Sequence, residues 1–364
     1  MAKTLQQVLG GENLTGVINS AAGGVPDDLL PPGLQAATRT VDGDVGTYYK
    51  VENTRKTARQ KAYGSKAEER GHEQVVEQPM KLIHAVEMQR HKPDTLMNLR
   101  STNGGKQILG EQEVSRQVVE FKRLFTNLRL GAIYSTLANG KIWFDADGEL
   151  LPSASGTSVT VDWSVPAGNQ NQLDALGAGA IIDASWAVAG TKIITHIKKI
   201  KQAARILSGL PIRHCLYGSN IPDYLLTNTQ LKELLSRQGE TRTSLIGGEI
   251  PNGVLGLNWW PVDQAFFKDS GGTNQTFFGA DSAIFIPDVT TDWYDLPEGS
   301  YPVPSTIDVA VDASTAIDNM NTVSGMFSYA TVTVNPVGIE HVAGDTFLPV
   351  LRNANAIFIG DVTP

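Results

Sequence analysis

GEQEVSRQVVEFKRLFTNLRLGAIYSTLANG, residues 110–140, predicts one long α-helix. No proline interrupts 111–138, and the carboxylates of Glu111 and Glu113 stand in the first turn, where the helix dipole favours negative charge. Asn139 and Gly140 tolerate the left-handed geometry that ends helices. A helix over about 111–138 would be roughly 42 Å long and would act as a spine for other elements. Its apolar residues recur every three or four positions and so fall on one stripe: Val114, Val118, Phe121, Leu124, Phe125, Leu128, Ile133 and Leu137.

A β-hairpin is predicted directly after the spine. Residues 141–145 (KIWFD) and 149–151 (ELL) are strand-like, and Asp147-Gly148 between them accepts the positive φ angles of tight turns. Residues 158–165 (SVTVDWSV) alternate apolar and polar side chains, which predicts a further strand.

Composition limits the class of protein. With 364 residues, 41% of them hydrophobic, the chain can bury two cores, and its 36 glycines and 18 prolines predict many turns. The single cysteine, Cys215, excludes an intrachain disulfide and fits a reducing compartment. Residues 1–7 lack the apolar segment of a signal peptide, and no apolar run is long enough to span a bilayer. We therefore expect a soluble protein, made inside the cell, with no membrane partner.

The net charge of −8 is unevenly distributed along the chain. Residues 50–92 contain ten Lys or Arg and six Glu, a net charge of +4, so the remainder carries −12. A basic segment in an acidic protein can bind nucleic acid, or an acidic surface on another copy of the same protein. The overall acidity argues against a dedicated nucleic-acid binder.

This basic segment is predicted to form a projecting loop. Residues 45–51 and 75–84 look like strands that flank a polar tip, 54–70, with almost no large apolar residue. Such a tip cannot build a core of its own, so it is either solvated in a monomer or ordered on a partner, and the flanking strands favour a partner. Its cations are the candidate subunit-interface residues: Arg55, Lys56, Arg59, Lys61, Lys66 and Arg70.

The first 40 residues show little periodicity. Pro26, Pro31 and Pro32 would break any long element, which predicts an extended arm. The arm's apolar residues need a surface to lie on: Leu29, Leu30 and Leu34.

From residue 190 to 290 helix-like and strand-like segments alternate, which predicts a mixed α/β unit. Helices are expected at 190–208 and from Asn220 onwards, and strands at 212–218, 254–260, 275–278 and 282–286. Residues 347–351 and 356–359 predict closing strands, which we expect to return to the sheet that follows the spine. Two domains built from interleaved chain segments are therefore expected.

No catalytic or metal-binding motif is complete. His-Glu at 72–73 lacks the second histidine of a zinc protease, Gly-Lys at 105–106 lacks the rest of a phosphate-binding loop, and residues 145–148 lack the rest of a calcium loop. The six histidines are scattered, and neighbours His214 and Cys215 would point to opposite faces of a strand. We therefore predict no catalytic residue, no metal and no cofactor.

Taken in order, these features resemble a major capsid protein of tailed bacteriophages of the lambda type. The resemblance runs through most of the chain: the polar arm, the spine, the strand at 159–163, the helix that ends at Ser208-Gly209, and the YGSN motif at 217–220. The most specific part is the tail, FLPVLRNANAIFI at 347–359, which is similar to the closing strands of that family. Each motif is weak alone, and their order carries the resemblance.

The resemblance implies an α+β fold, the tailed-phage capsid fold, in four parts. They would be an N-terminal arm (1–40), an extended loop (41–92), a peripheral domain around the spine (93–200 and 330–364) and an axial domain (201–329). It implies a structural protein that assembles with itself, as hexamers and pentamers, into an icosahedral head around double-stranded DNA. It also implies scaffolding, portal and decoration proteins as partners, non-specific contact with DNA, and assembly in the bacterial cytoplasm into the virion.

Two alternatives stay open on the sequence alone: an encapsulin-like shell that houses protein cargo, and a soluble hydrolase with an unrecognised site. The spine begins near residue 110, which leaves no room for the cleaved scaffolding segment of some relatives, so we expect a separate scaffold. Lys56, Lys61 and Lys66 lie in the loop, but no partner asparagine can be identified, so no covalent cross-link is predicted.

Overall fold

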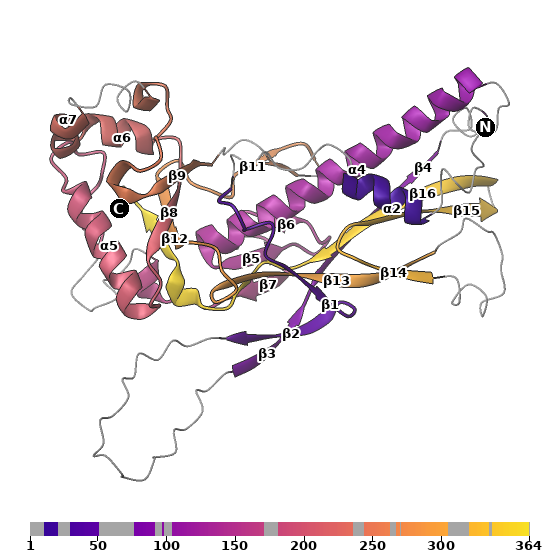
Figure 1. Cartoon of the computed structure of the whole chain (residues 1–364), viewed down its shortest axis with the longest axis horizontal. Helices are drawn as coiled ribbons and strands as arrows, with labels where there is room; N and C mark the ends of the chain where they lie inside the picture. Colours follow the sequence, from indigo (N-terminus) through magenta and orange to yellow (C-terminus); the bar gives the residue numbers. More distant parts are fainter. Residues whose placement is uncertain are drawn as a thin grey trace, which may run out of the picture.

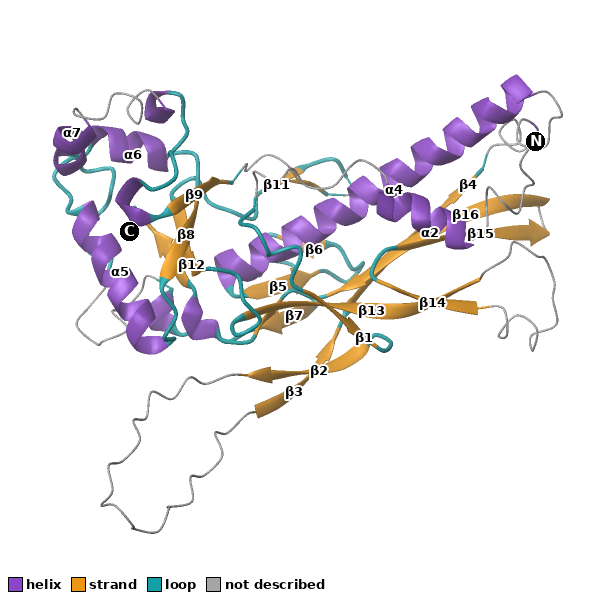
Figure 2. Ribbon diagram, viewed as in Figure 1, coloured by secondary structure: helices purple, strands orange, loops and turns teal. Residues whose placement is uncertain are grey.

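The computed structural model describes residues 11–20, 30–50, 76–91, 97, 104–170, 181–235, 244–262, 267–269, 271–304, 320–334 and 337–363. These residues form a mixed α+β fold in which one long helix, α4, crosses the molecule and several sheets lie along it (Figure 1). A unit with helices α5, α6 and α7 lies at one end of α4, and the short helix α2 lies along its other half (Figure 2).

Helix α4 spans Gly104–Asn139, so it contains the expected spine over 111–138 and begins before it. Its 36 residues correspond to about 54 Å. The helix ends at Gly140, whose φ is +63° and whose N–H donates to the carbonyl oxygen of Thr136 at 3.0 Å. A Cβ at Gly140 would lie 2.4 Å from the side chain of Val165, so this stop requires glycine.

The hairpin predicted after the spine is confirmed. Strands β5 (Lys141–Phe144) and β6 (Leu150–Leu151) are antiparallel, and β5 also pairs with β7 (Val159–Asp162). The turn is held by Asp145, whose Oδ1 accepts from the N–H groups of Asp147 at 2.9 Å and Glu149 at 2.8 Å. Gly148 has a φ of +85°, as the Asp-Gly pair predicted.

The largest sheet has seven strands and lies beside the first half of α4 (Figure 1). Its centre is β16 (Val337–Phe347), which pairs antiparallel with β15 (Phe327–Val334), β4 (Ile83–Arg90) and β13 (Tyr294–Pro304). Three shorter strands pair with β13: β1 (Thr38–Val41), β14 (Met320–Ser324) and β17 (Val350–Leu351).

The expected extended arm contains a helix that sequence analysis missed. Helix α2 (Gly11–Ser20) packs on α4 and the large sheet, with Leu14 and Ile18 fully buried beside Val114 and Val118. The Thr15 hydroxyl donates to the carbonyl oxygen of Ser328 at 2.9 Å. Periodicity over ten residues is too short to reveal such a helix, because its stability comes from tertiary contacts.

The two leucines of the arm that the structure describes, Leu30 and Leu34, are buried against the main core, as expected. Leu29 lies outside the described residues.

A four-stranded sheet in the order β18-β12-β8-β9 separates two hydrophobic cores. Strands β8 and β9 are parallel, and the other pairs are antiparallel. One face packs on the core around α4, and the other is covered by the three helices (Figure 1). The strands are β8 (Ile212–Tyr217), β9 (Asn258–Pro261), β12 (Ser282–Pro287) and β18 (Phe358–Asp361), and the helices are α5 (Ile193–Leu207), α6 (Ile221–Thr227) and α7 (Thr229–Leu235).

The prediction that the tail returns to the sheet after the spine is wrong. Strand β17 pairs with β13, and β18 pairs with β12. Successive tail residues serve both cores: Phe358 packs against Phe285 at 6.2 Å between ring centroids, and Ile359 packs on the core around α4. A strand that is apolar on both faces suits this interior position better than the exposed sheet of β7.

The strand predicted at 254–260 is shorter than expected. Positive φ angles of +92° at Gly253, +57° at Leu255 and +67° at Gly256 bend residues 254–256 into a short 3₁₀ turn, and β9 begins only at Asn258. The strand predicted at 275–278 is likewise only the pair β11 (Asn274–Gln275), opposite β10 (Phe267–Lys268).

Candidate assembly surfaces

The hairpin that leads into the basic loop is anchored to the body of the protein. Strands β2 (Val45–Lys50) and β3 (Val76–Lys81) pair antiparallel, as the sequence predicted. Tyr48 of β2 is buried and meets the ring of Trp163 edge-on at 5.6 Å between centroids. Met80 of β3 is buried in the same core. The hairpin itself projects away from α4 (Figure 1), so a loop between these strands starts from a fixed base.

The candidate loop residues themselves lie outside the described residues, so their positions are not given by the structure: Arg55, Lys56, Arg59, Lys61, Lys66 and Arg70.

The spine residues are divided between two environments. Val114, Val118, Phe121 and Phe125 are buried beneath α2 and the large sheet, and Leu128 is half-buried. Leu124, by contrast, is 55% exposed. Successive residues of a helix are rotated by about 100°, which turns Leu124 out of the stripe that contains Phe125.

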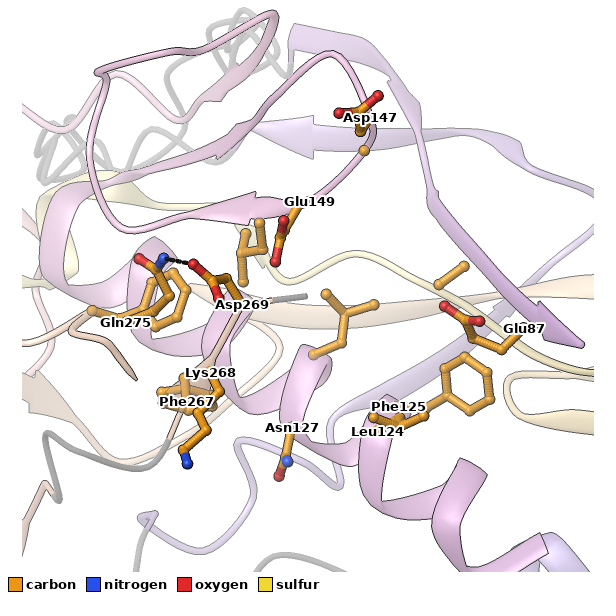
Figure 3. A pocket seen from close by; sticks show the side chains of 15 residues that line it. Glu87, Leu124, Phe125, Asn127, Asp147, Glu149, Phe267, Lys268, Asp269 and Gln275 are labelled. Carbon is orange, nitrogen blue, oxygen red and sulfur yellow. Dashed lines mark hydrogen bonds between the residues drawn. The ribbon is translucent and has the colours of Figure 1, made fainter. Parts of the chain in front are cut away.

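Leu124 and Leu128 line an open groove of about 410 Å³ beside the middle of α4 (Figure 3). The groove is also lined by Phe267 of β10, by Phe277 just after β11, by residues 147–150 of the β5–β6 hairpin and by Ala85 of β4. The floor is therefore apolar and comes from four separate parts of the chain.

Carboxylates outnumber cations in this groove. Among the described residues that line it are Glu87, Asp147, Glu149 and Asp269, and the one Lys or Arg among them is Lys268 (Figure 3). Asp269 is fixed in place: its Oδ1 accepts from the N–H of Thr273 at 2.6 Å, and hydrogen bonds from Thr273 and Gln275 lower the pKa of its carboxyl. The groove is thus an apolar surface with a negative rim.

His214 and Cys215 lie on opposite faces of β8, as predicted. His214 Nε2 is 3.0 Å from Asp288 Oδ1, and its Nδ1 accepts from the indole of Trp260 at 3.1 Å. Cys215 is buried in the other core, where burial raises the pKa of its thiol. His214 is held by hydrogen bonds and Cys215 is buried, which is typical of structural side chains and not of nucleophiles.

In the part of the chain that the structure describes, no group of three His, Cys, Asp or Glu side chains could hold a metal ion. No helix in that part is long and apolar enough to cross a membrane.

A model of the family described as phage major capsid protein E matches residues 12–362. The chain belongs to this family. It is thus a major capsid protein of a tailed phage, a structural component of the icosahedral head and not an enzyme. Membership of this family excludes the two alternatives that the sequence left open, an encapsulin-like shell and a soluble hydrolase.

Two solved structures are similar to the capsid protein. One is from a prophage of Escherichia coli CFT073 and is described as a capsid protein; it is 14% identical, with a TM-score of 0.50 over 79% of this chain and 80% of that chain. The other is a phage-related protein from Bordetella bronchiseptica RB50, 11% identical, with a TM-score of 0.51 over 99% of both chains. At these identities the likeness concerns the fold alone. No curated protein matches the chain in sequence.

The carboxylates of the groove were not singled out by sequence analysis. Glu87, Asp147 and Asp269 are far apart in the chain and meet only because β4, the β5–β6 turn and β10 converge beside α4. No local spacing could have revealed them. For Asp147 and Asp269 the available signal was the excess of acidic residues outside 50–92, and Glu87 lies within that range.

Proposed function

We propose that the capsid protein assembles as hexamers and pentamers around the double-stranded DNA of a tailed phage, with the extended loop of each copy lying over its neighbour. The supporting observation is a charge match within one chain. The sequence of the loop carries six cations over 54–70, and the groove beside α4 has a rim of four carboxylates. Opposite charges on two different surfaces favour head-to-tail contacts, which close into rings around a symmetry axis.

The apolar floor of the groove adds to this match. Leu124 is more than half exposed in the subunit alone, and burying it against a neighbour would remove apolar surface from water. An exposed ion pair contributes little by itself. A shell repeats the same contact in every subunit, so many weak contacts give a stable particle.

We keep the four proposed parts of the subunit: arm 1–40, extended loop 41–92, peripheral domain 93–200 with 330–364, and axial domain 201–329. The packing favours one adjustment. Ile193 and Ile197 of α5, together with Phe358 of β18, share a core with β8 and β12. Residues 181–200 and 358–362 therefore fit better with the axial domain.

The remaining partners are also proposals. Scaffolding, portal and decoration proteins would join the shell during assembly in the host bacterial cytoplasm. Contact with packaged DNA would be weak and independent of sequence, since the protein has a net charge of −8.

A charge exchange tests the loop contact. Arg55→Glu, Lys56→Glu and Arg59→Glu together should abolish shells seen by negative-stain microscopy, while the circular dichroism of the subunit stays unchanged. Adding Glu87→Lys and Asp147→Lys in the groove should restore some shells, because the charges again match. Normal shells from the loop variant alone would contradict the docking role. A wild-type protein that stays monomeric at every salt concentration would contradict assembly itself.

A further inference from the structure

One long stretch of this acidic protein contains no acidic residue. Residues 184–222 include six Lys or Arg and no Asp or Glu, although acidic residues outnumber basic ones by 38 to 30 in the whole chain. This stretch includes α5 and β8. It is separate from the basic segment at 50–92.

Helix α5 presents these cations on its outer face. Its inner face, with Ile193, Ile197 and Ile200, is buried against the four-stranded sheet. The opposite face is exposed to solvent at the edge of the molecule, on the side of the sheet away from α4 (Figure 1). Four exposed cations lie on or just before it: Lys192, Lys198, Lys199 and Arg205.

The cations are arranged in two rows along the helix. Lys192 and Lys199 are seven residues apart, and so are Lys198 and Arg205, which places the members of each pair about 10 Å apart on the same side of α5. The structure shows no ion pair for any of the four among the described residues. Lys201 differs, because its ammonium donates to the carbonyl oxygens of Leu255 at 2.8 Å and Gly256 at 2.9 Å.

The neighbouring carboxylate is already engaged. Asp183 Oδ1 is 2.8 Å from Nε2 of His196, and this hydrogen bond lowers the pKa of the carboxyl, with a smaller contribution from the charge of Lys199. One carboxylate thus lies near a face that presents four cations. The outer face of α5 therefore keeps a local positive charge.

The residue types favour a phosphate backbone over an acidic protein surface. Cores of protein–protein interfaces are depleted in lysine and enriched in aromatic side chains, whereas three of these four cations are lysines. The only large hydrophobic residue of α5 that is strongly exposed is Ile206. Lys and Arg on one helix face are the usual footprint of sequence-independent DNA binding.

We propose that the outer face of α5 is the surface through which the shell contacts the phosphates of packaged double-stranded DNA. This rests on the proposed function, since it requires that the head encloses DNA. The DNA contact would then be made by α5, and the outer face of α5 would point toward the interior of the shell.

The test compares two triple variants with the wild-type subunit. One replaces Lys198→Gln, Lys199→Gln and Arg205→Gln; the control replaces three scattered exposed cations, Lys81→Gln, Arg123→Gln and Lys232→Gln. Both remove three charges, and glutamine keeps a similar helix propensity. Binding of a labelled duplex of mixed sequence is followed by fluorescence anisotropy across a salt series, and shells are counted by negative-stain microscopy.

The α5 variant should bind at least tenfold more weakly at low salt. Its slope of log K against log salt should fall by about 3, because each phosphate contact contributes about 0.9. The control should bind like wild type, and both variants should form shells. DNA binding that is equal in wild type and the α5 variant, or equally weakened in the control, would overturn the proposal. So would loss of shells with DNA binding unchanged, which would mark the face as a contact between copies. Absence of shells from the wild type would instead contradict the proposed function.

Discussion

Arg129 of α4 donates two parallel hydrogen bonds to Asp345 of β16, with Nε 2.5 Å from Oδ2 and Nη2 2.6 Å from Oδ1. Its third nitrogen, Nη1, is 2.6 Å from Oε1 of Glu298 on β13, and its guanidinium lies 5.2 Å from the centre of the Phe347 ring. Burial raises the pKa of Asp345, and the contact with Arg129 opposes that shift. The spine is thereby joined to two strands of the large sheet at one point.

Replacing Arg129 should destabilise the subunit strongly. Arg129→Met would leave the carboxylate of Asp345, which is fully buried, without its cation, and loss of one partner of a buried pair costs about 3–5 kcal/mol. Urea unfolding of the unassembled subunit measures this free energy. Arg116→Met on the same helix is the control, because Arg116 is exposed and pairs only with Glu113 and Glu120. Equal effects of the two changes would contradict a special role for Arg129.

Two buried histidines should make the subunit sensitive to acid. His341 and His91 stack at 5.7 Å between ring centroids, and His341 Nε2 lies 2.6 Å from the hydroxyl oxygen of Ser328. Burial lowers the pKa of His341 to about 3 and also lowers the pKa of His91. An unfolded histidine binds its proton near pH 6.5, so the unfolded state holds more protons between about 6.5 and 3. Stability should therefore be complete above this window and fall as the pH falls through it.

The measurement is the free energy of unfolding between pH 7 and 5, above the range in which most carboxyls titrate. Each histidine of this kind contributes a slope of up to about 1.4 kcal/mol per pH unit. His341→Gln should reduce the slope, since glutamine does not titrate. The remainder would come from His91, His196 and His214, because burial also lowers the pKa of each of these histidines. An unchanged slope would show that His341 is not responsible.

Gly218 should tolerate no side chain. A Cβ there would lie 2.3 Å from the carbonyl oxygens of Gly279 and Ala280, and backbone atoms cannot move aside. Gly218→Ala should cost about 1–3 kcal/mol of unfolding free energy. Gly190→Ala is the matched control, because nothing lies within 4 Å of its Cβ position. Similar unfolding midpoints for the two variants would show that the turn after β8 adjusts easily.

Local patterns predicted much of this fold. The periodicity of apolar residues predicted α4 and α5, and the Asp-Gly turn predicted the hairpin of β5 and β6, because these elements depend on residues near one another in the chain. Contacts between distant segments were not predictable. The docking of α2 depends on Thr15 meeting Ser328, and the tail strand β18 was assigned to the wrong sheet. The groove was missed for the same reason, since its residues come together only through packing.

Leu124 and Phe125 are adjacent in α4, but we expect substitution of Leu124 to affect assembly and substitution of Phe125 to affect folding. Both residues line the groove, but Phe125 is 2% exposed and belongs to the core shared with α2, whereas Leu124 is 55% exposed. Phe125→Ala should cost about 3–5 kcal/mol in subunit unfolding, because it empties a packed site.

Leu124→Ala should change the free energy of subunit unfolding by no more than about 0.5 kcal/mol, since the residue is exposed in the unassembled subunit and alanine favours helix. It should nevertheless lower the yield of shells, measured by light scattering and microscopy at equal protein concentration, because the neighbour loses an apolar contact. A Leu124→Ala protein that assembles at the wild-type rate would exclude the groove as a contact between copies, even if the Phe125 result is as expected.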